Sequence, residues 1–138
     1  MENNHHSNPY HDLVQTICAN IPMVLGIYLF GSRSLGSQHA DSDIDLALLS
    51  KQKLPEIKTW ALAQTLAAKY SRDVDLIDLN QASTVMRMQV ISKGQRIYCS
   101  NEQWCEMFED FVFSDYARLN EERAGILEDI GQRGAVYG

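Results

Sequence analysis

Cysteine is scarce in this sequence, and its positions exclude the two roles that it most often has in small domains. There are three cysteines, Cys18, Cys99 and Cys105, and no two of them form a C-x-x-C pair. An odd number argues against a disulfide framework, and the missing pair argues against a structural zinc site. We therefore expect reduced cysteines that pack as small apolar side chains.

Long apolar runs and an excess of positive charge are also missing. No stretch approaches the roughly 20 apolar residues that span a bilayer. The start, MENNHHSNPYHD, lacks the basic and then apolar order of a signal peptide, so we expect a cytoplasmic protein with no membrane partner. Twelve Lys and Arg against 18 Asp and Glu give a net charge of -6, which argues against direct binding of nucleic acid. A nucleotide substrate remains possible, because bound divalent metals reverse the local field.

The remaining composition is that of one globular domain. The chain has 138 residues and is 45% apolar, enough to bury a single core. Apolar periodicity predicts strands at residues 24–30, 44–49, 73–79 and 96–100. It predicts helices at residues 12–19, 55–70 and 82–92, and one or two helices over 102–130. Alternation of helices and strands indicates an α/β or α+β fold.

Two details of the later helices follow from the same pattern. Gly94 is a plausible C-terminal stop for the helix that precedes it. In the last helical segment, four aromatic side chains are expected on the apolar side, packed either in the core or against a partner: Trp104, Phe108, Phe111 and Tyr116.

A glycine turn and paired carboxylates lie between the first two predicted strands. Gly31 and Ser32 follow the first strand, and ten residues separate them from Asp43 and Asp45 at the start of the second. Glycine lets a ligand approach the backbone, and the turn after Ser32 can point N–H groups at a phosphate. The two carboxylates project from the same face, because they lie two residues apart on a strand. We expect a phosphate and cation site here.

A second pair of aspartates, Asp73 and Asp75, repeats this alternation on the third predicted strand. Carboxylates that lie close together repel unless a cation lies between them, and oxygen-only ligands suit Mg²⁺ or Mn²⁺. Three carboxylates on neighbouring strands are what a two-metal nucleotidyl transfer centre needs. A Gly-Ser pair or an Asp-x-Asp alone is most often a turn or a solvated strand edge. The ordered set of elements favours catalysis.

The stretch YLFGSRSLGSQHADSDIDLALL resembles the minimal nucleotidyltransferase (MNT) branch of the DNA polymerase β-type nucleotidyltransferase superfamily. The resemblance covers residues 24–100 and rests on the pattern G-S-x(10)-D-x-D followed by a later carboxylate. It implies a nucleotidyltransferase fold, an α/β (α+β) arrangement with helices packed on a small mixed β-sheet. Residues 1–100 would form the minimal nucleotidyltransferase domain, and residues 101–138 a C-terminal helical extension of it.

The resemblance also implies roles for the site residues. Gly31 and Ser32 would hold the β and γ phosphates of ATP, and Arg33 could reach the triphosphate. The catalytic carboxylates, which would also ligate two Mg²⁺ ions or alternatively Mn²⁺, would be Asp43, Asp45 and Asp75. The family has a small residue and a glycine after Ser-Arg, a pattern that this loop matches only approximately.

Minimal nucleotidyltransferases of this size pair with HEPN-domain proteins, often toxic ribonucleases, and act as antitoxins. The resemblance therefore implies a protein adenylyltransferase that moves AMP from ATP to a hydroxyl, first of all a tyrosine, of a HEPN toxin. Two alternatives stay open: a non-catalytic antitoxin that covers its partner, and an enzyme that modifies a small-molecule hydroxyl. The chain lacks the separate substrate domain of aminoglycoside nucleotidyltransferases, which favours a protein target.

Other polar residues are interpreted by their position. Asp78 has the opposite parity to Asp75, so it should face away from the site and have a structural role. His39 is expected to be exposed, because the metal chemistry prefers oxygen ligands. Arg87 is either a nucleotide contact or a surface charge, and the role of Asp73 stays open.

Overall fold

A computed structural model of the chain describes residues 9–31 and 43–137. Its centre is a sheet of four strands, which are β1 (Val24–Phe30), β2 (Ile44–Ser50), β3 (Val74–Asp78) and β4 (Gln95–Cys99). The strand order is β3-β2-β1-β4. β1 is antiparallel to both β2 and β4, whereas β2 and β3 are parallel. The sheet is therefore mixed, and each strand lies within one residue of its predicted ends.

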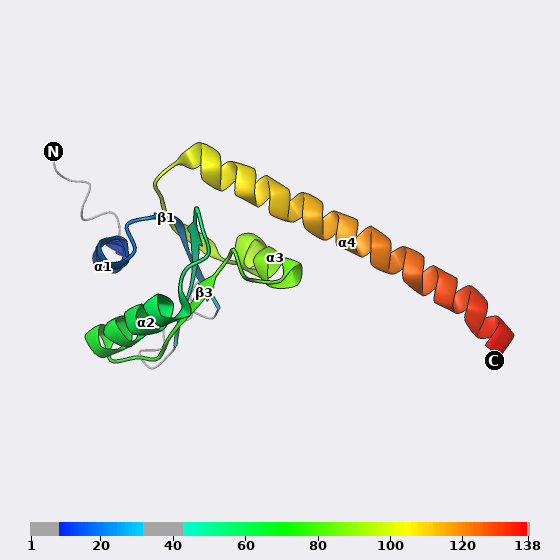
Figure 1. Cartoon of the computed structure of the whole chain (residues 1–138), viewed down its shortest axis with the longest axis horizontal. Helices are drawn as coiled ribbons and strands as arrows, with labels where there is room; N and C mark the ends of the chain where they lie inside the picture. Colours follow the sequence, from blue (N-terminus) through cyan, green and yellow to red (C-terminus); the bar gives the residue numbers. More distant parts are fainter. Residues whose placement is uncertain (1–8, 32–42, 138) are drawn as a thin grey trace.

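Helices cover both faces of the sheet (Figure 1). Two of them, α1 (His11–Asn20) and α2 (Glu56–Tyr70), pack on one face, where Leu13, Leu66 and Leu46 belong to a single apolar cluster. The other two, α3 (Thr84–Lys93) and α4 (Glu102–Tyr137), lie on the opposite face. The α/β class expected from the sequence is confirmed.

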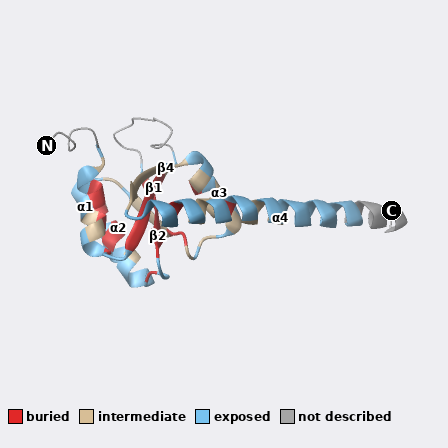
Figure 2. Cartoon of the chain, turned by 90° about the horizontal axis from the view of Figure 1, so that it is seen from above, coloured by how far each residue is buried: buried red, intermediate tan, exposed pale blue. Residues whose placement is uncertain are grey.

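The central strands β1 and β2 are buried along almost their whole length, as Figure 2 shows in red. They are continuous apolar runs because each of their faces packs against helices. Leu46 and Leu48 face α1 and α2, whereas Ala47 and Leu49 face α3 and α4. This two-sided burial makes the sheet a firm base for the turn that follows β1.

α3 ends at Gly94, as predicted, and its amide donates to the Val90 carbonyl oxygen at 2.8 Å. The backbone of Gly94 is extended, with φ at -87°, so the left-handed turn typical of such glycines is absent here. The reason for glycine is instead close packing. A Cβ atom at this position would lie 2.9 Å from the Leu29 carbonyl oxygen of β1.

α4 is one continuous helix of 36 residues that extends well beyond the sheet (Figure 1). In the first half of α4, Cys105 and Val112 are buried, and Phe108 and Tyr116 are half-buried on the same side of the helix. For the other two aromatic residues the core interpretation is wrong, since Trp104 is 46% exposed and Phe111 is 54% exposed. Trp104 and Phe111 are seven residues apart, so they lie on the same side of the helix. They form a separate stripe beside the buried row. No helix in the described part of the chain is long and apolar enough to cross a membrane.

Candidate active site

Strand register brings the predicted carboxylates to one end of the sheet. Phe30, the last residue of β1, pairs with Asp45 of β2, and Asp45 pairs with Asp75 of the parallel strand β3. Paired residues of neighbouring strands point to the same side of a sheet. Asp45 and Asp75 therefore lie side by side on the face that α3 and α4 cover. Asp43 precedes β2 and is exposed at the same end.

Gly31 makes the turn at this end of the sheet. Its φ is +79°, in the left-handed region that glycine enters without a steric penalty. A Cβ atom here would overlap the Asp45 Oδ2 atom and would lie 3.2 Å from the Asp45 Cγ atom. The glycine expected from the sequence to admit a ligand thus also admits the carboxylate of Asp45.

The electrostatics of Asp45 show that these carboxylates interact. Burial, followed by the negative charges of Asp75 and then Asp43, raises the pKa of the Asp45 carboxyl above its ordinary value. Each of these causes disfavours the charged form of Asp45, because an ionised Asp45 is partly desolvated and is repelled by Asp75 and Asp43. A positive charge placed among the three carboxylates would offset this repulsion.

The donor set fits a hard divalent cation. Asp43, Asp45 and Asp75 supply carboxylate oxygen, which Mg²⁺ and Mn²⁺ prefer. In residues 9–31 and 43–137, no three acidic, histidine or cysteine side chains lie close enough together to form a complete metal-ligand cluster. The described residues therefore provide the charge and the donor type that such an ion needs, and the carboxylates would have to move closer together to ligate it.

An open, polar hollow of about 550 Å³ adjoins Asp43 and is also lined by Gln64, Arg72 and Asp73. A second hollow, of about 280 Å³, lies beside Asp75 and is lined by Gln64 as well. Neither Gln64 nor Arg72 was identified from the sequence, because an isolated glutamine or arginine in a helix or turn carries no motif. Arg72 brings a positive charge to the hollow that adjoins Asp43.

Two residues considered from the sequence lie elsewhere and are structural. Asp78 is buried at the other end of β3, as its parity predicted. Arg87 donates from Nε to the Leu79 carbonyl oxygen at 2.7 Å and from Nη2 to the Asn80 carbonyl oxygen at 3.1 Å. Its guanidinium also lies over the Phe108 ring, 6.0 Å from the centroid, so it ties α3 to β3 and α4. These contacts give Arg87 a structural role in the described residues.

Three of the loop residues considered from the sequence, Ser32, Arg33 and His39, lie outside the described residues. The described part of the site therefore consists of Gly31 and the carboxylates. The turn at Gly31 leads directly into the phosphate-binding loop that the sequence predicts.

Comparisons with known proteins place this site in a family. Residues 13–103 match the family described as Polymerase beta, Nucleotidyltransferase. A curated relative, the protein adenylyltransferase MntA of Shewanella oneidensis, is 42% identical over 118 residues, which cover 86% of this chain and 84% of the relative.

Two solved structures are similar over nearly the same span. One is a crystal structure of a toxin–antitoxin with AMP-PNP, which is 41% identical with a TM-score of 0.79 and covers 88% of this chain and 98% of that one. The other contains a tri-AMPylated Shewanella oneidensis HEPN toxin in complex with an MNT antitoxin. It is 38% identical with a TM-score of 0.72 and covers 87% of this chain and 93% of that one.

Proposed function

This chain belongs to the Polymerase beta nucleotidyltransferase family, and we propose that it transfers AMP from ATP to a hydroxyl of a HEPN-domain toxin and thereby neutralises it. The observation that carries this proposal is the pairing of Asp45 with Asp75 beside the turn at Gly31. The related MntA is named a protein adenylyltransferase, and a similar structure contains an AMP-modified HEPN toxin. Tyrosine is the acceptor that we expect first.

We assign the roles at the site as follows. Gly31 and Ser32 hold the β and γ phosphates of ATP, and Arg33 reaches the triphosphate. The residues that would hold the divalent metal are Asp43, Asp45 and Asp75. Bound there, Mg²⁺ would neutralise the triphosphate and make the attacking hydroxyl more acidic, with Mn²⁺ as a substitute.

The protein's own contribution is to hold these groups in register. Asp45 is fixed against Gly31, and burial and the neighbouring carboxylates raise its pKa. Asp75 is exposed on β3, the edge strand next to β2, where a protein hydroxyl can approach it. The acceptor oxygen attacks the α-phosphorus in line, and pyrophosphate leaves with the bond to the bridging oxygen. The hydroxyl proton moves towards the Asp75 carboxylate.

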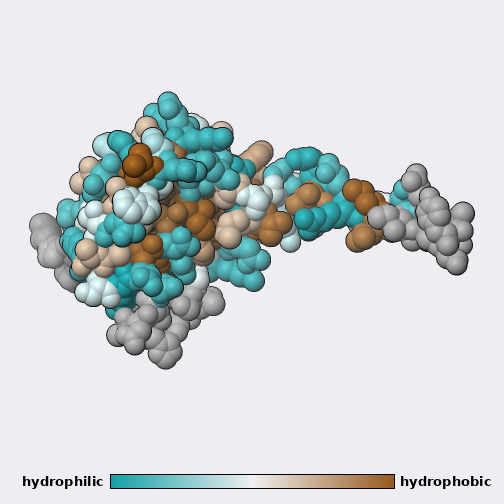
Figure 3. Space-filling view, turned by 60° about the horizontal axis from the view of Figure 1, so that its bottom comes forward, coloured by the Kyte–Doolittle hydropathy of each residue, from teal (hydrophilic) through white to brown (hydrophobic). Residues whose placement is uncertain are grey.

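The surface that best fits a protein partner lies on α4. Of the eleven large apolar side chains that are exposed in the described part of the chain, six lie on this helix. They are Trp104, Met107, Phe111, Phe113, Ile126 and Leu127. Figure 3 shows apolar side chains spaced along the projecting arm. We therefore propose that residues 101–138 are a helical extension that docks the HEPN toxin, and that residues 1–100 form the catalytic domain.

Two parts of this proposal follow from the chemistry of the reaction. ATP and Mg²⁺ are both required, so we propose that the protein works in the cytoplasm, where both are abundant. A rival function, in which the protein neutralises its partner by covering it, would use the same α4 surface without transfer. The carboxylates speak against that rival, because a purely steric inhibitor gains nothing from charges that repel.

Intact mass spectrometry of the HEPN partner tests the proposal. The partner is incubated with the 138-residue chain, ATP and Mg²⁺, and we expect the partner to gain one or more AMP units. The folded variant Asp43→Asn should give no gain. Full transfer by that variant would contradict the assignment of the carboxylates, whereas a stable complex with no transfer by the wild type would favour the covering function.

A further inference from the structure

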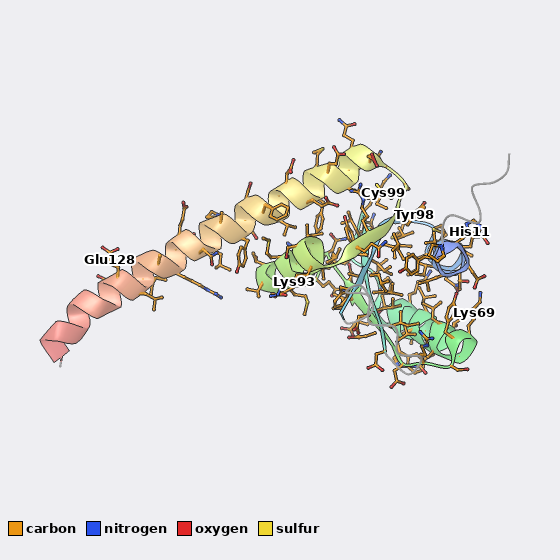
Figure 4. The ribbon with its side chains drawn as sticks, turned by 180° about the vertical axis from the view of Figure 1, so that it is seen from behind. His11, Lys69, Lys93, Tyr98, Cys99 and Glu128 are labelled. Carbon is orange, nitrogen blue, oxygen red and sulfur yellow. The ribbon has the colours of Figure 1, made fainter. Side chains whose placement is uncertain are left out.

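Two cysteines meet where the sheet joins α4. Cys99 is the last residue of β4, and Cys105 lies in the first turns of α4, with residues 100–104 between them. Their Sγ atoms are 2.6 Å apart. Figure 4 shows Cys99 at the end of β4, close to the start of the long helix.

The surrounding structure fixes both side chains in this arrangement. Cys105 is fully buried, and its thiol lies 3.6 Å from the Leu25 carbonyl oxygen of β1. A Cβ atom on Gly26 would approach the Cys105 Sγ to 3.2 Å, so β1 leaves little room behind the sulfur. On the other side, the Ser100 amide donates to the same Leu25 oxygen at 2.8 Å and holds the end of β4. The two thiols therefore face each other and have little freedom to separate.

We propose that Cys99 and Cys105 form a reversible disulfide that joins β4 to the first turns of α4. The sulfur atoms need to approach by only about half an ångström to reach a bond length of about 2.05 Å. All three cysteines are free thiols in the structure, as the sequence predicts, and the bond would form from the reduced pair. In a reducing compartment such a bond forms transiently under oxidation rather than as a permanent brace.

The two thiols differ in their access to an oxidant. Cys99 is half-buried and can be reached by a small peroxide, whereas Cys105 is fully buried. Burial, together with the contact to Cys99, raises the pKa of the Cys105 thiol to about 12, so Cys105 stays protonated at neutral pH. We therefore assign the first step to Cys99.

Oxidation by hydrogen peroxide proceeds in two balanced steps. The Cys99 sulfur attacks one peroxide oxygen, the O–O bond breaks, and a sulfenic acid and one water form. The Cys105 sulfur then attacks the Cys99 sulfur, the S–O bond breaks, and a second water leaves with the Cys105 proton. Two thiols are oxidised by two electrons, and one peroxide is reduced to two waters.

Thiol counting on the 138-residue chain tests this proposal. The reduced protein has three thiols, and after peroxide treatment and alkylation under denaturing conditions we expect one, which is three minus the paired two. The intact mass should fall by two hydrogen atoms, and a peptide that joins Cys99 to Cys105 should appear. Dithiothreitol should restore all three thiols and the original mass.

Matched serine variants separate this pair from other oxidation. Cys18→Ser should still lose two thiols, whereas Cys99→Ser, at a half-buried position that tolerates a hydroxyl, should form no intramolecular bond. Oxidation should also raise the unfolding midpoint of the wild type and leave that of Cys99→Ser unchanged. The proposal fails if all three thiols survive peroxide that fully oxidises free dithiothreitol. It also fails if Cys99 gains oxygen atoms without forming the bond.

Discussion

β3 carries an aspartate near each end, and the two have opposite surroundings. Asp78 is buried, and its carboxylate accepts hydrogen bonds from the Leu54 amide at 2.8 Å, the Asn80 amide at 3.0 Å and the Gln81 Nε2 at 2.8 Å. Asp75 is exposed, and its charge faces Asp45 on the next strand, where it raises the pKa of that carboxyl. The protein stabilises the Asp78 carboxylate by hydrogen bonds, whereas the Asp75 carboxylate repels the neighbouring carboxylate of Asp45.

The difference shows which charges serve the fold and which serve a ligand. A buried carboxylate with several donors stabilises the structure, and its loss leaves those donors unpaired. Carboxylates that repel one another cost stability, so they are explained by a positive partner that arrives later. The fold therefore rests on the Asp78 end of β3, and nucleotide transfer depends on the Asp75 end.

The largest effect should come from removing charge at the Asp75 end. Asp75→Asn should lower AMP transfer to the HEPN partner by at least about 100-fold, because a catalytic carboxylate is lost. Asp73→Asn is the matched control, since Asp73 is also exposed beside β3, and it should retain transfer within about threefold. Both rates can be measured by following the modified partner over time. Equal losses in both variants would remove the special role of Asp75.

At the other end, Asp78→Asn should act on stability instead of chemistry. Replacing one carboxylate oxygen by an NH₂ group sets a donor against the donors of Leu54 and Gln81. We expect a loss of about 2 kcal/mol in the free energy of unfolding, measured by urea denaturation. Transfer per folded molecule should be unchanged. If the variant kept its stability but lost transfer, the two ends of β3 would not differ as we describe.

Gly31→Ala should lower both the rate of AMP transfer and the stability of the fold, each by less than the two substitutions above. The new Cβ atom would overlap the Asp45 carboxylate, and alanine is strained at a φ of +79°. Together these should cost about 1–2 kcal/mol of stability and displace Asp45 from its position. Thermal unfolding measures the first effect, and an AMP-transfer assay measures the second. Gly125→Ala is the control, because a Cβ atom there meets nothing within 4 Å.

The smallest effect is expected for Asp45→Asn in the absence of metal. Unlike the other substitutions, it should increase the free energy of unfolding. The folded state raises the pKa of Asp45, so this group favours folding at low pH, and that contribution is lost as the pH rises through its folded pKa. At neutral pH the neutral amide should therefore stabilise the protein, by less than about 1 kcal/mol because the group is partly solvated. Unfolding curves at acidic and neutral pH should show this gain only at the higher pH. A destabilised variant at neutral pH would contradict the repulsion.

The sequence predicted the helices and strands along the chain better than it predicted the contacts between them. The apolar runs of β1 and β2 predicted buried strands, and the alternation of Asp43 with Asp45 placed both carboxylates on one face. The orientation of α4 was missed, because Trp104 and Phe111 fit an apolar row as well as Cys105 and Val112 do. Pairing between α4 and α3 decides which row is buried, and this contact is not encoded in the helical period.

The same limit applies within the site. Asp75 was recognised through its family position, but its direct pairing with Asp45 depends on the parallel register of β2 and β3. Arg87 was considered as a nucleotide contact from its place on the helix before Gly94. Its true partners, the carbonyl oxygens of Leu79 and Asn80, become visible only once α3 packs against the end of β3.

The most direct measurement is the unfolding midpoint with and without Mg²⁺ and AMP-PNP, for the wild type, Asp43→Asn and Asp73→Asn. A ligand that binds only the folded state raises the midpoint by an amount that grows with the logarithm of its concentration divided by its Kd. We predict a clear rise for the wild type and for Asp73→Asn, and none for Asp43→Asn. A full rise in Asp43→Asn, or none in the wild type, would contradict the claim that these carboxylates bind a metal–nucleotide ligand.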